Sequence, residues 1–111
     1  MALRIHGQML GTPTGTDLLL FNCPFTEFVS SKLSVCNNSV GGVTFAVYVV
    51  PSGETVGTQH LIRGQTEALA ASTSVDISSG ITLARGDAIY VRSSAATTVF
   101  TLFGEGIGDA G

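Results

Sequence analysis

The chain has 111 residues, a length that fits one domain with a single modest core. Its formal net charge is −3 and its 5 basic residues are scattered, which argues against a nucleic-acid partner. Charged residues make up only 12% and the mean hydropathy is +0.42. This excludes a disordered chain and is unusual for a lone soluble monomer, whose surface is about 25–35% charged. We therefore expect that something covers part of the surface, and self-assembly is the simplest candidate.

The first residues, "MALRIHGQML", lack the basic-then-apolar pattern of a secretory signal. No segment approaches the roughly 20 apolar residues of a membrane span. Neither export by the usual secretory route nor membrane insertion is expected.

Short runs rich in Val, Ile, Thr, Phe and Tyr alternate with turn-forming clusters about every ten residues. This pattern predicts an all-β fold, a single antiparallel β-sandwich of the jelly-roll or immunoglobulin-like type with about eight short strands. A loop with an irregular turn is predicted over Thr66–Ser72. The predicted strands are Leu3–Met9, Leu18–Asn22, Phe28–Asn37, Val43–Val50, Gln59–Arg63, Ser74–Ile77, Ile89–Arg92 and Val99–Phe103.

The ends of the chain differ in character from its middle. Residues 1–10 are predicted to form a strand, or an arm that adds to a neighbour's sheet. Residues 11–104 form the sandwich domain, and residues 105–111 form a Gly-rich C-terminal tail, ordered or frayed.

Alternation along each strand assigns its side chains to the two faces of the sheet. Val29, Leu33 and Val35 are predicted to face the core, which places Cys36 on the outer side. In Val43–Val50, one face carries Val43, Phe45, Val47 and Val49, and the opposite face is also apolar. The last strand repeats this, with Val99 and Phe103 against Phe100 and Leu102.

Strands that are apolar on both faces are buried on both sides. The second covering layer is either another copy or neighbouring protein, or the chain's own tails and loops. We favour the first alternative. The predicted assembly contacts are Leu3, Ile5, Thr44, Ala46, Tyr48, Val50, Phe100 and Leu102.

The sequence offers little for catalysis. The only histidines, His6 and His60, belong to no catalytic motif. Cys23 and Cys36 lack the close spacing of a zinc site, and we favour free thiols over a disulfide. We predict no enzyme, no catalytic residue, no cofactor and no metal site.

Three short patterns mark turns or loops. Asn37-Asn38-Ser39 matches an N-glycosylation acceptor, but a turn in which Asn tolerates positive φ is the stronger interpretation. Pro51-Ser52-Gly53 begins a loop at one end of the sandwich, or a loop that contacts a partner.

Arg85-Gly86-Asp87 matches an integrin-binding tripeptide but lies between two strand-like runs, Ile81/Leu83 and Ile89/Val91. A tight turn accounts for Gly86 through positive φ and for Asp87 through bonds to backbone N–H groups, which leaves Arg85 incidental.

The stretches "FVSSKLSVCNNS", "FAVYVVPSGETVG" and "SSGITLARGDAIYVRSSAATTVFTLFGEGI" resemble a family of small virion structural proteins of tailed bacteriophages. The most specific matches are Val35-Cys36-Asn37, Pro51-Ser52-Gly53 and the block from Gly80 to Gly104. In the family, the position of Arg85 is variable. The segment containing Cys23, "FNCPFTE", departs from the family's pattern.

The resemblance implies an exterior virion component, made in the bacterial cytoplasm, that decorates or cements the capsid. A module of the tail, collar or fibre is the alternative. The implied partners are copies of the chain, with a trimer as one option, and the major capsid or tail protein. A receptor- or carbohydrate-binding head would need exposed aromatic side chains, for which the chain offers Tyr48 and Tyr90.

Overall fold

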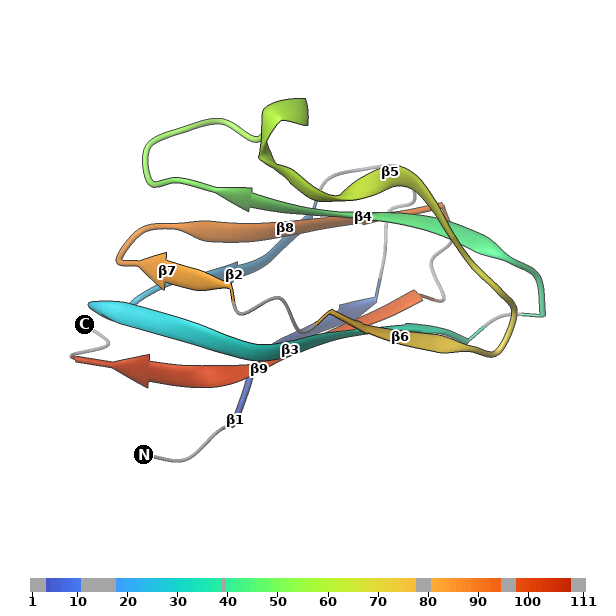
Figure 1. The fold of residues 1–111 in the computed structure, drawn as a ribbon, viewed down its shortest axis with the longest axis horizontal. Coiled ribbons are helices and arrows are strands. Elements are labelled where there is room, and N and C mark those ends of the chain that lie inside the picture. The colour runs from blue at the N-terminus through green and yellow to red at the C-terminus, as the bar shows by residue number, and fades with distance from the viewer. Residues whose placement is uncertain (1–3, 11–17, 39, 78–80, 95–97, 109–111) are drawn as a thin grey trace.

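The computed structural model describes residues 4–10, 18–38, 40–77, 81–94 and 98–108. Over these ranges the chain forms nine β-strands and one turn of 3-10 helix, named η1 (Figure 1). The elements are β1 (Arg4–Leu10), β2 (Leu18–Asn22), β3 (Glu27–Asn37), β4 (Val43–Val50), η1 (Thr58–His60), β5 (Leu61–Leu69), β6 (Ser74–Ile77), β7 (Thr82–Ala84), β8 (Ala88–Ser93) and β9 (Thr98–Ile107).

The strands form two antiparallel sheets, and the predicted β-sandwich is confirmed. Sheet A has the order β1-β9-β3-β6, with β7 also pairing with β3, and sheet B has the order β2-β8-β4-β5. The pairs are nested: β1 with β9, β2 with β8, β3 with β6 and β4 with β5. Such nesting arises when one long antiparallel ribbon is rolled up, which is the jelly-roll alternative of the prediction.

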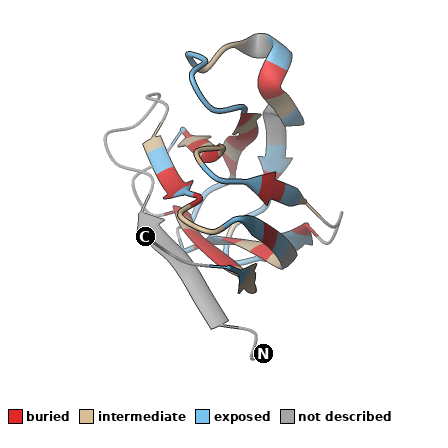
Figure 2. Ribbon diagram, turned by 90° about the vertical axis from the view of Figure 1, so that its left-hand side faces the viewer, coloured by how far each residue is buried: buried red, intermediate tan, exposed pale blue. Residues whose placement is uncertain are grey.

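The core lies between the two sheets, where the inward side chains of alternate positions meet. The ribbon in Figure 2 is coloured by burial and shows buried residues in both sheets. Phe28, Phe45 and Phe100 are its largest apolar side chains, all fully buried. Phe21 packs against Phe28 with ring centroids 4.7 Å apart. Aromatic contacts of this kind add to the burial energy of each ring.

Three predicted strands have the observed bounds, namely Leu18–Asn22, Val43–Val50 and Ser74–Ile77. The largest error concerns Thr66–Ser72, which was predicted as a loop, although β5 continues to Leu69. Thr66 is the one β-branched residue of Thr66–Leu69, but antiparallel pairing with β4, such as Val43 with Leu69, holds the segment in the sheet.

β9 is longer than the predicted strand Val99–Phe103, because Gly104 and Gly106 do not end it. The strand continues to Ile107 and pairs with β3 as far as Glu27, so residues 105–107 belong to the sheet and not to a tail. Gly104 is required there, since a Cβ would meet the Phe28 ring and lie 2.6 Å from the carbonyl oxygen of Val29.

A β-bulge in β3 overturns the predicted face of Val29. The register with β9 shifts between Ser30 and Lys32, which inserts one extra residue and reverses the alternation. Phe28 and Leu33 therefore both face the core, while Val29 is 40% exposed on the outer face.

Candidate functional site

The outer face of sheet B carries a second apolar cluster. Ala46, Tyr48 and Val50 project away from the main core, yet all three are buried. Val56, Leu61 and Tyr90 pack against them. The strand register aligns Tyr90 with Tyr48 and Tyr48 with Leu61, so the cluster spans three neighbouring strands.

The chain itself covers this cluster. Residues 51–60, here named the cover loop, leave β4 at Pro51 and return to β5 through η1, and Val56 packs on the cluster. Three of the predicted assembly contacts are Ala46, Tyr48 and Val50. They do not form an exposed contact surface, because the chain's own loop supplies their second layer. Periodicity revealed the apolar face but could not reveal what covers it.

Other predicted contact residues are placed differently. Phe100 and Leu102 lie fully buried between the sheets, so their prediction as contacts is wrong. Thr44 is half-buried on β4, and its backbone N–H donates to Ser94 Oγ at 2.9 Å. Ile5 lies in β1, opposite Phe103, and Leu3 falls outside the described residues.

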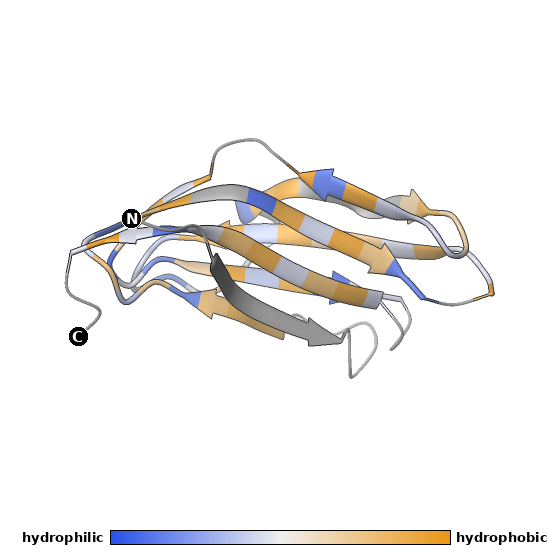
Figure 3. Ribbon diagram, turned by 90° about the horizontal axis from the view of Figure 1, so that it is seen from below, coloured by the Kyte–Doolittle hydropathy of each residue, from blue (hydrophilic) through white to orange (hydrophobic). Residues whose placement is uncertain are grey.

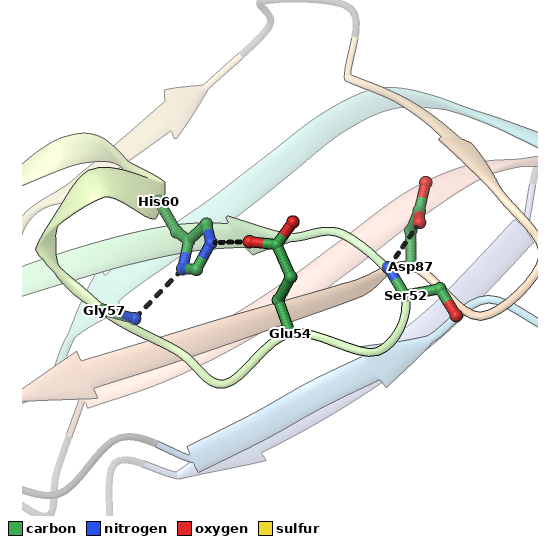
Figure 4. A network of polar contacts seen from close by, with 5 residues as sticks. All are labelled: Ser52, Glu54, Gly57, His60 and Asp87. Atoms are coloured by element: carbon green, nitrogen blue, oxygen red, sulfur yellow. Dashed lines mark hydrogen bonds and ion pairs between the residues drawn. The ribbon is translucent and has the colours of Figure 1, made fainter.

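The base of the cover loop is held by Asp87. The Ser52 N–H donates to Asp87 Oδ1 at 2.9 Å (Figure 4). A turn follows in which the Glu54 N–H donates to the Pro51 carbonyl at 3.1 Å, with Gly53 at φ 84°. A carboxylate from the turn before β8 thus positions the first turn of the loop.

The tip of the cover loop is held by His60. The Gly57 N–H donates to His60 Nδ1 at 3.0 Å, and His60 Nε2 lies 2.9 Å from Glu54 Oε1 (Figure 4). Nδ1 accepts a bond, so in the neutral ring the proton is on Nε2 and points at the carboxylate. Both nitrogens are occupied, which leaves no lone pair for a substrate proton in this arrangement.

The turn at Arg85-Gly86-Asp87 has the predicted structure. Gly86 adopts φ 91°, and the Ala84 N–H donates to Asp87 Oδ2 at 2.9 Å. Asp87 also donates its N–H to the Ala84 carbonyl at 3.1 Å, which closes the turn. The carboxylate of Asp87 therefore joins two segments, its own turn and the cover loop at Ser52.

Gly86 is required for a second reason, which is its close approach to the cover loop. A Cβ at this position would lie 2.5 Å from Ser52 Oγ. Arg85 is not incidental, and this corrects the prediction. Its Nη1 donates to the Pro24 carbonyl at 2.6 Å, and its Nη2 lies 3.5 Å from Thr26 Oγ1.

The two cysteines are free thiols in different environments. Cys36 is exposed on the outer face of β3, as predicted. Cys23 is buried, and this burial is the main cause that raises the pKa of its thiol, with the nearby Asp87 acting in the same direction. A bond to the Phe25 carbonyl and the charge of Arg85 oppose the shift.

Asn37 is a structural residue at the end of β3. It is fully buried, and its Nδ2 donates to the carbonyls of Gly41, Leu69 and Ala70 at 2.9, 3.1 and 3.0 Å. The predicted positive φ is wrong, because Ser72 is the one non-glycine residue with positive φ among those described. An amide engaged in this way is not accessible as a glycan acceptor.

The outer face of sheet A carries several apolar side chains that the sandwich core does not bury. Val29 and Ile107 are exposed, and Val99 and Phe103 are half-buried. Lys32 Nζ lies 5.1 Å from the Phe103 ring centroid and 3.8 Å from Asp76 Oδ2. Figure 3 shows this side of the molecule, with apolar and polar residues alternating along its strands.

Alternation in the sequence places Val99 and Phe103 on one face of this strand, whereas the predicted contacts, Phe100 and Leu102, lie on the opposite face. The structure keeps this division into two faces, but the face with the predicted contacts is the inner one. The position of Ile107 could not be predicted, because the Gly-rich end was expected to be a tail.

In the described ranges, His, Cys, Asp and Glu side chains nowhere gather in threes in a way that could hold a metal ion. The described part of the chain also holds no helical segment with the length and hydropathy that a bilayer crossing requires. Comparison with known proteins brought no match: no family model, no curated protein and no solved structure matches this chain.

Proposed function

We propose that this chain is a non-enzymatic structural protein of a tailed-bacteriophage virion, an exterior component that decorates or cements the capsid. It acts there by packing as a homo-oligomer, and the outer face of sheet A makes the contact. The same surface would serve a tail, collar or fibre module.

The observation that carries the proposal is the apolar side-chain row of sheet A. Val29, Val99, Phe103 and Ile107 lie on the outer side of two neighbouring strands, β3 and β9. Such a row of apolar side chains on one exposed sheet face is typical of an interaction site. The resemblance carried by Gly80–Gly104 supports a virion as the place of assembly.

A sugar-binding head is less well supported. Tyr48 is 2% exposed beneath the cover loop, so its ring cannot stack on a sugar. Tyr90 is half-buried in the same cluster. The engaged nitrogens of His60 likewise favour a structural role over catalysis.

The test compares the molar mass of three purified chains by light scattering. The wild type is expected to be an oligomer, and Phe103→Glu is expected to lower its mass because a carboxylate would be buried at the contact. Ile62→Glu is the matched control, since Ile62 is an exposed apolar residue of sheet B.

A strictly monomeric wild type, or an equal loss of mass in Phe103→Glu and Ile62→Glu, would contradict the proposal. Rebinding to virions that lack the protein tests the location. Wild-type chain should restore them, and Phe103→Glu, checked for folding by circular dichroism, should not.

A further inference from the structure

The cover loop lies over an apolar surface. A small number of polar contacts hold the loop in this position. Its residues 51–55 are exposed, and Val56 is the loop's apolar contact with the cluster below. Beneath it lie Ala46, Tyr48 and Val50, which would meet solvent if the loop moved away. The position of the loop therefore decides whether sheet B presents a polar or an apolar outer face.

His60 is the buried polar side chain that ties the two halves of the loop together. Its side chain is 6% exposed, and it bonds Gly57 through Nδ1 and Glu54 through Nε2. The bond from Gly57 requires a lone pair on Nδ1, so the closed loop requires the neutral imidazole. His60 is thus the main side-chain latch of the loop, and an imidazole is the side chain whose change of charge ordinarily falls near physiological pH.

Protonation of Nδ1 breaks the hydrogen bond from Gly57, because the Gly57 N–H would then face the N–H of Nδ1. The attraction of Glu54 for the imidazolium opposes this effect, but that carboxylate is 53% exposed and solvent screens it. The titratable or charged side chains of the underlying strands are Tyr48 of β4 and Tyr90 and Arg92 of β8. Among the side chains that the structure describes, none of these three bonds His60, and its contacts are those with Gly57 and Glu54.

We propose that His60 is an acid-sensitive latch whose protonation releases the cover loop and uncovers Ala46, Tyr48 and Val50. When the loop is open, His60 Nδ1 can bind a proton freely. When the loop is closed, binding a proton there costs the hydrogen bond from Gly57. By linkage, the closed fraction falls as the pH falls and the imidazole takes up this proton. This device lies on the sheet opposite the proposed assembly face and does not depend on it.

The chain offers a matched pair of variants, because His6 and His60 are its only histidines. His6→Asn leaves His60 as the single titrating imidazole. His60→Asn removes the titration but keeps an acceptor, since an asparagine Oδ1 can take the place of Nδ1. Comparison of the two separates the latch from every other pH effect.

The primary measurement is hydrogen exchange of the Gly57 amide from pH 7.5 to pH 5.0, corrected for the intrinsic exchange rate. The protection factor should fall about fivefold or more in wild type and His6→Asn, as loss of one net hydrogen bond implies. It should stay constant in His60→Asn. An unchanged protection factor in His6→Asn, or an equal fall in His60→Asn, would overturn the proposal.

Tyrosine fluorescence gives a second readout, because the chain has no tryptophan and its 2 tyrosines both lie in the covered cluster. Quenching by acrylamide should increase at pH 5.0 in His6→Asn and remain unchanged in His60→Asn.

If His60→Asn does not fold, nuclear magnetic resonance of His6→Asn still decides the matter. The Gly57 amide signal must titrate with the same midpoint as the His60 ring, and a different midpoint refutes the latch.

Discussion

At Cys23 the backbone and the side chain have separate roles. The Cys23 N–H donates to the Asp87 carbonyl at 2.8 Å, and the Gly86 N–H donates to the Cys23 carbonyl at 2.9 Å. These two bonds attach the segment before β3 to the turn before β8. The thiol meanwhile is buried in the core, and this burial raises its pKa.

The raised pKa of Cys23 predicts a loss of stability in alkali. Above pH 9.0 the thiol of the unfolded chain ionises first, so the folded chain holds more protons and the free energy of unfolding falls as the pH rises. Urea unfolding under reducing conditions at pH 7.5 and pH 10 measures this loss. It should be smaller in Cys23→Ala than in the wild type.

Cys36→Ala is the control for that measurement. It removes a thiol that is exposed in the folded chain, and the alkaline loss should match that of the wild type. Equal losses in Cys23→Ala and the wild type would show that burial of Cys23 does not act on stability.

Asn37 shows how one side chain joins elements that are distant in sequence. Its amide connects the end of β3 with the loop before β4 at Gly41 and with the end of β5 at Leu69. Its own N–H donates to the Thr73 carbonyl at 2.8 Å, just before β6. This arrangement needs a donor at Nδ2, which an aspartate lacks.

Asn37→Asp should therefore lower the free energy of unfolding by about 3 kcal/mol or more, because a buried carboxylate would face carbonyl oxygens. Asn38→Asp makes the same chemical change at the next, exposed residue and should cost about 0.5 kcal/mol or less. Urea denaturation at pH 7 compares the two variants. Similar losses in both would contradict the role assigned to the Asn37 amide.

The elements that could be predicted are those with a strong local signal. Alternating apolar residues between turn-forming residues placed Val43–Val50 correctly, and glycine and aspartate in sequence placed the Gly86–Asp87 turn. The errors come from interactions distant in sequence. The bulge near Lys32 reversed the face of Val29, and pairing with β4 made a strand of a sequence with little strand propensity.

The candidate site was predictable to the same extent. Alternation showed that both faces of β4 are apolar, and it paired Val99 with Phe103. It could not show that the chain's own loop covers sheet B, since the Gly57–His60 bond and the packing of Val56 are set by tertiary structure. Arg85 likewise acquires its partner, Pro24, from a segment about sixty residues away.

On the scale of the whole molecule, the two ends of the chain meet in one sheet. β1 pairs with β9 from Arg4 opposite Gly104 to Leu10 opposite Val99, and β9 pairs on its other side with β3. Of the two alternatives predicted for residues 1–10, a strand or an arm, the structure has the strand over Arg4–Leu10. β9 also supplies Phe100 and Leu102 to the core, so its position affects both layers.

Deletion of residues 1–10 should therefore destabilise the single chain as well as any assembly. The ladder with β9 would be lost, and net contributions of about 0.5–1.5 kcal/mol for each bond predict a loss of about 3 kcal/mol or more. Urea unfolding at a protein concentration low enough to give monomers measures this loss. A peptide of residues 1–10 supplied separately should raise the unfolding midpoint again, because it can refill the vacant edge of β9. An arm that served only a neighbouring copy predicts the opposite result, an unchanged midpoint for the truncated monomer and no response to the peptide.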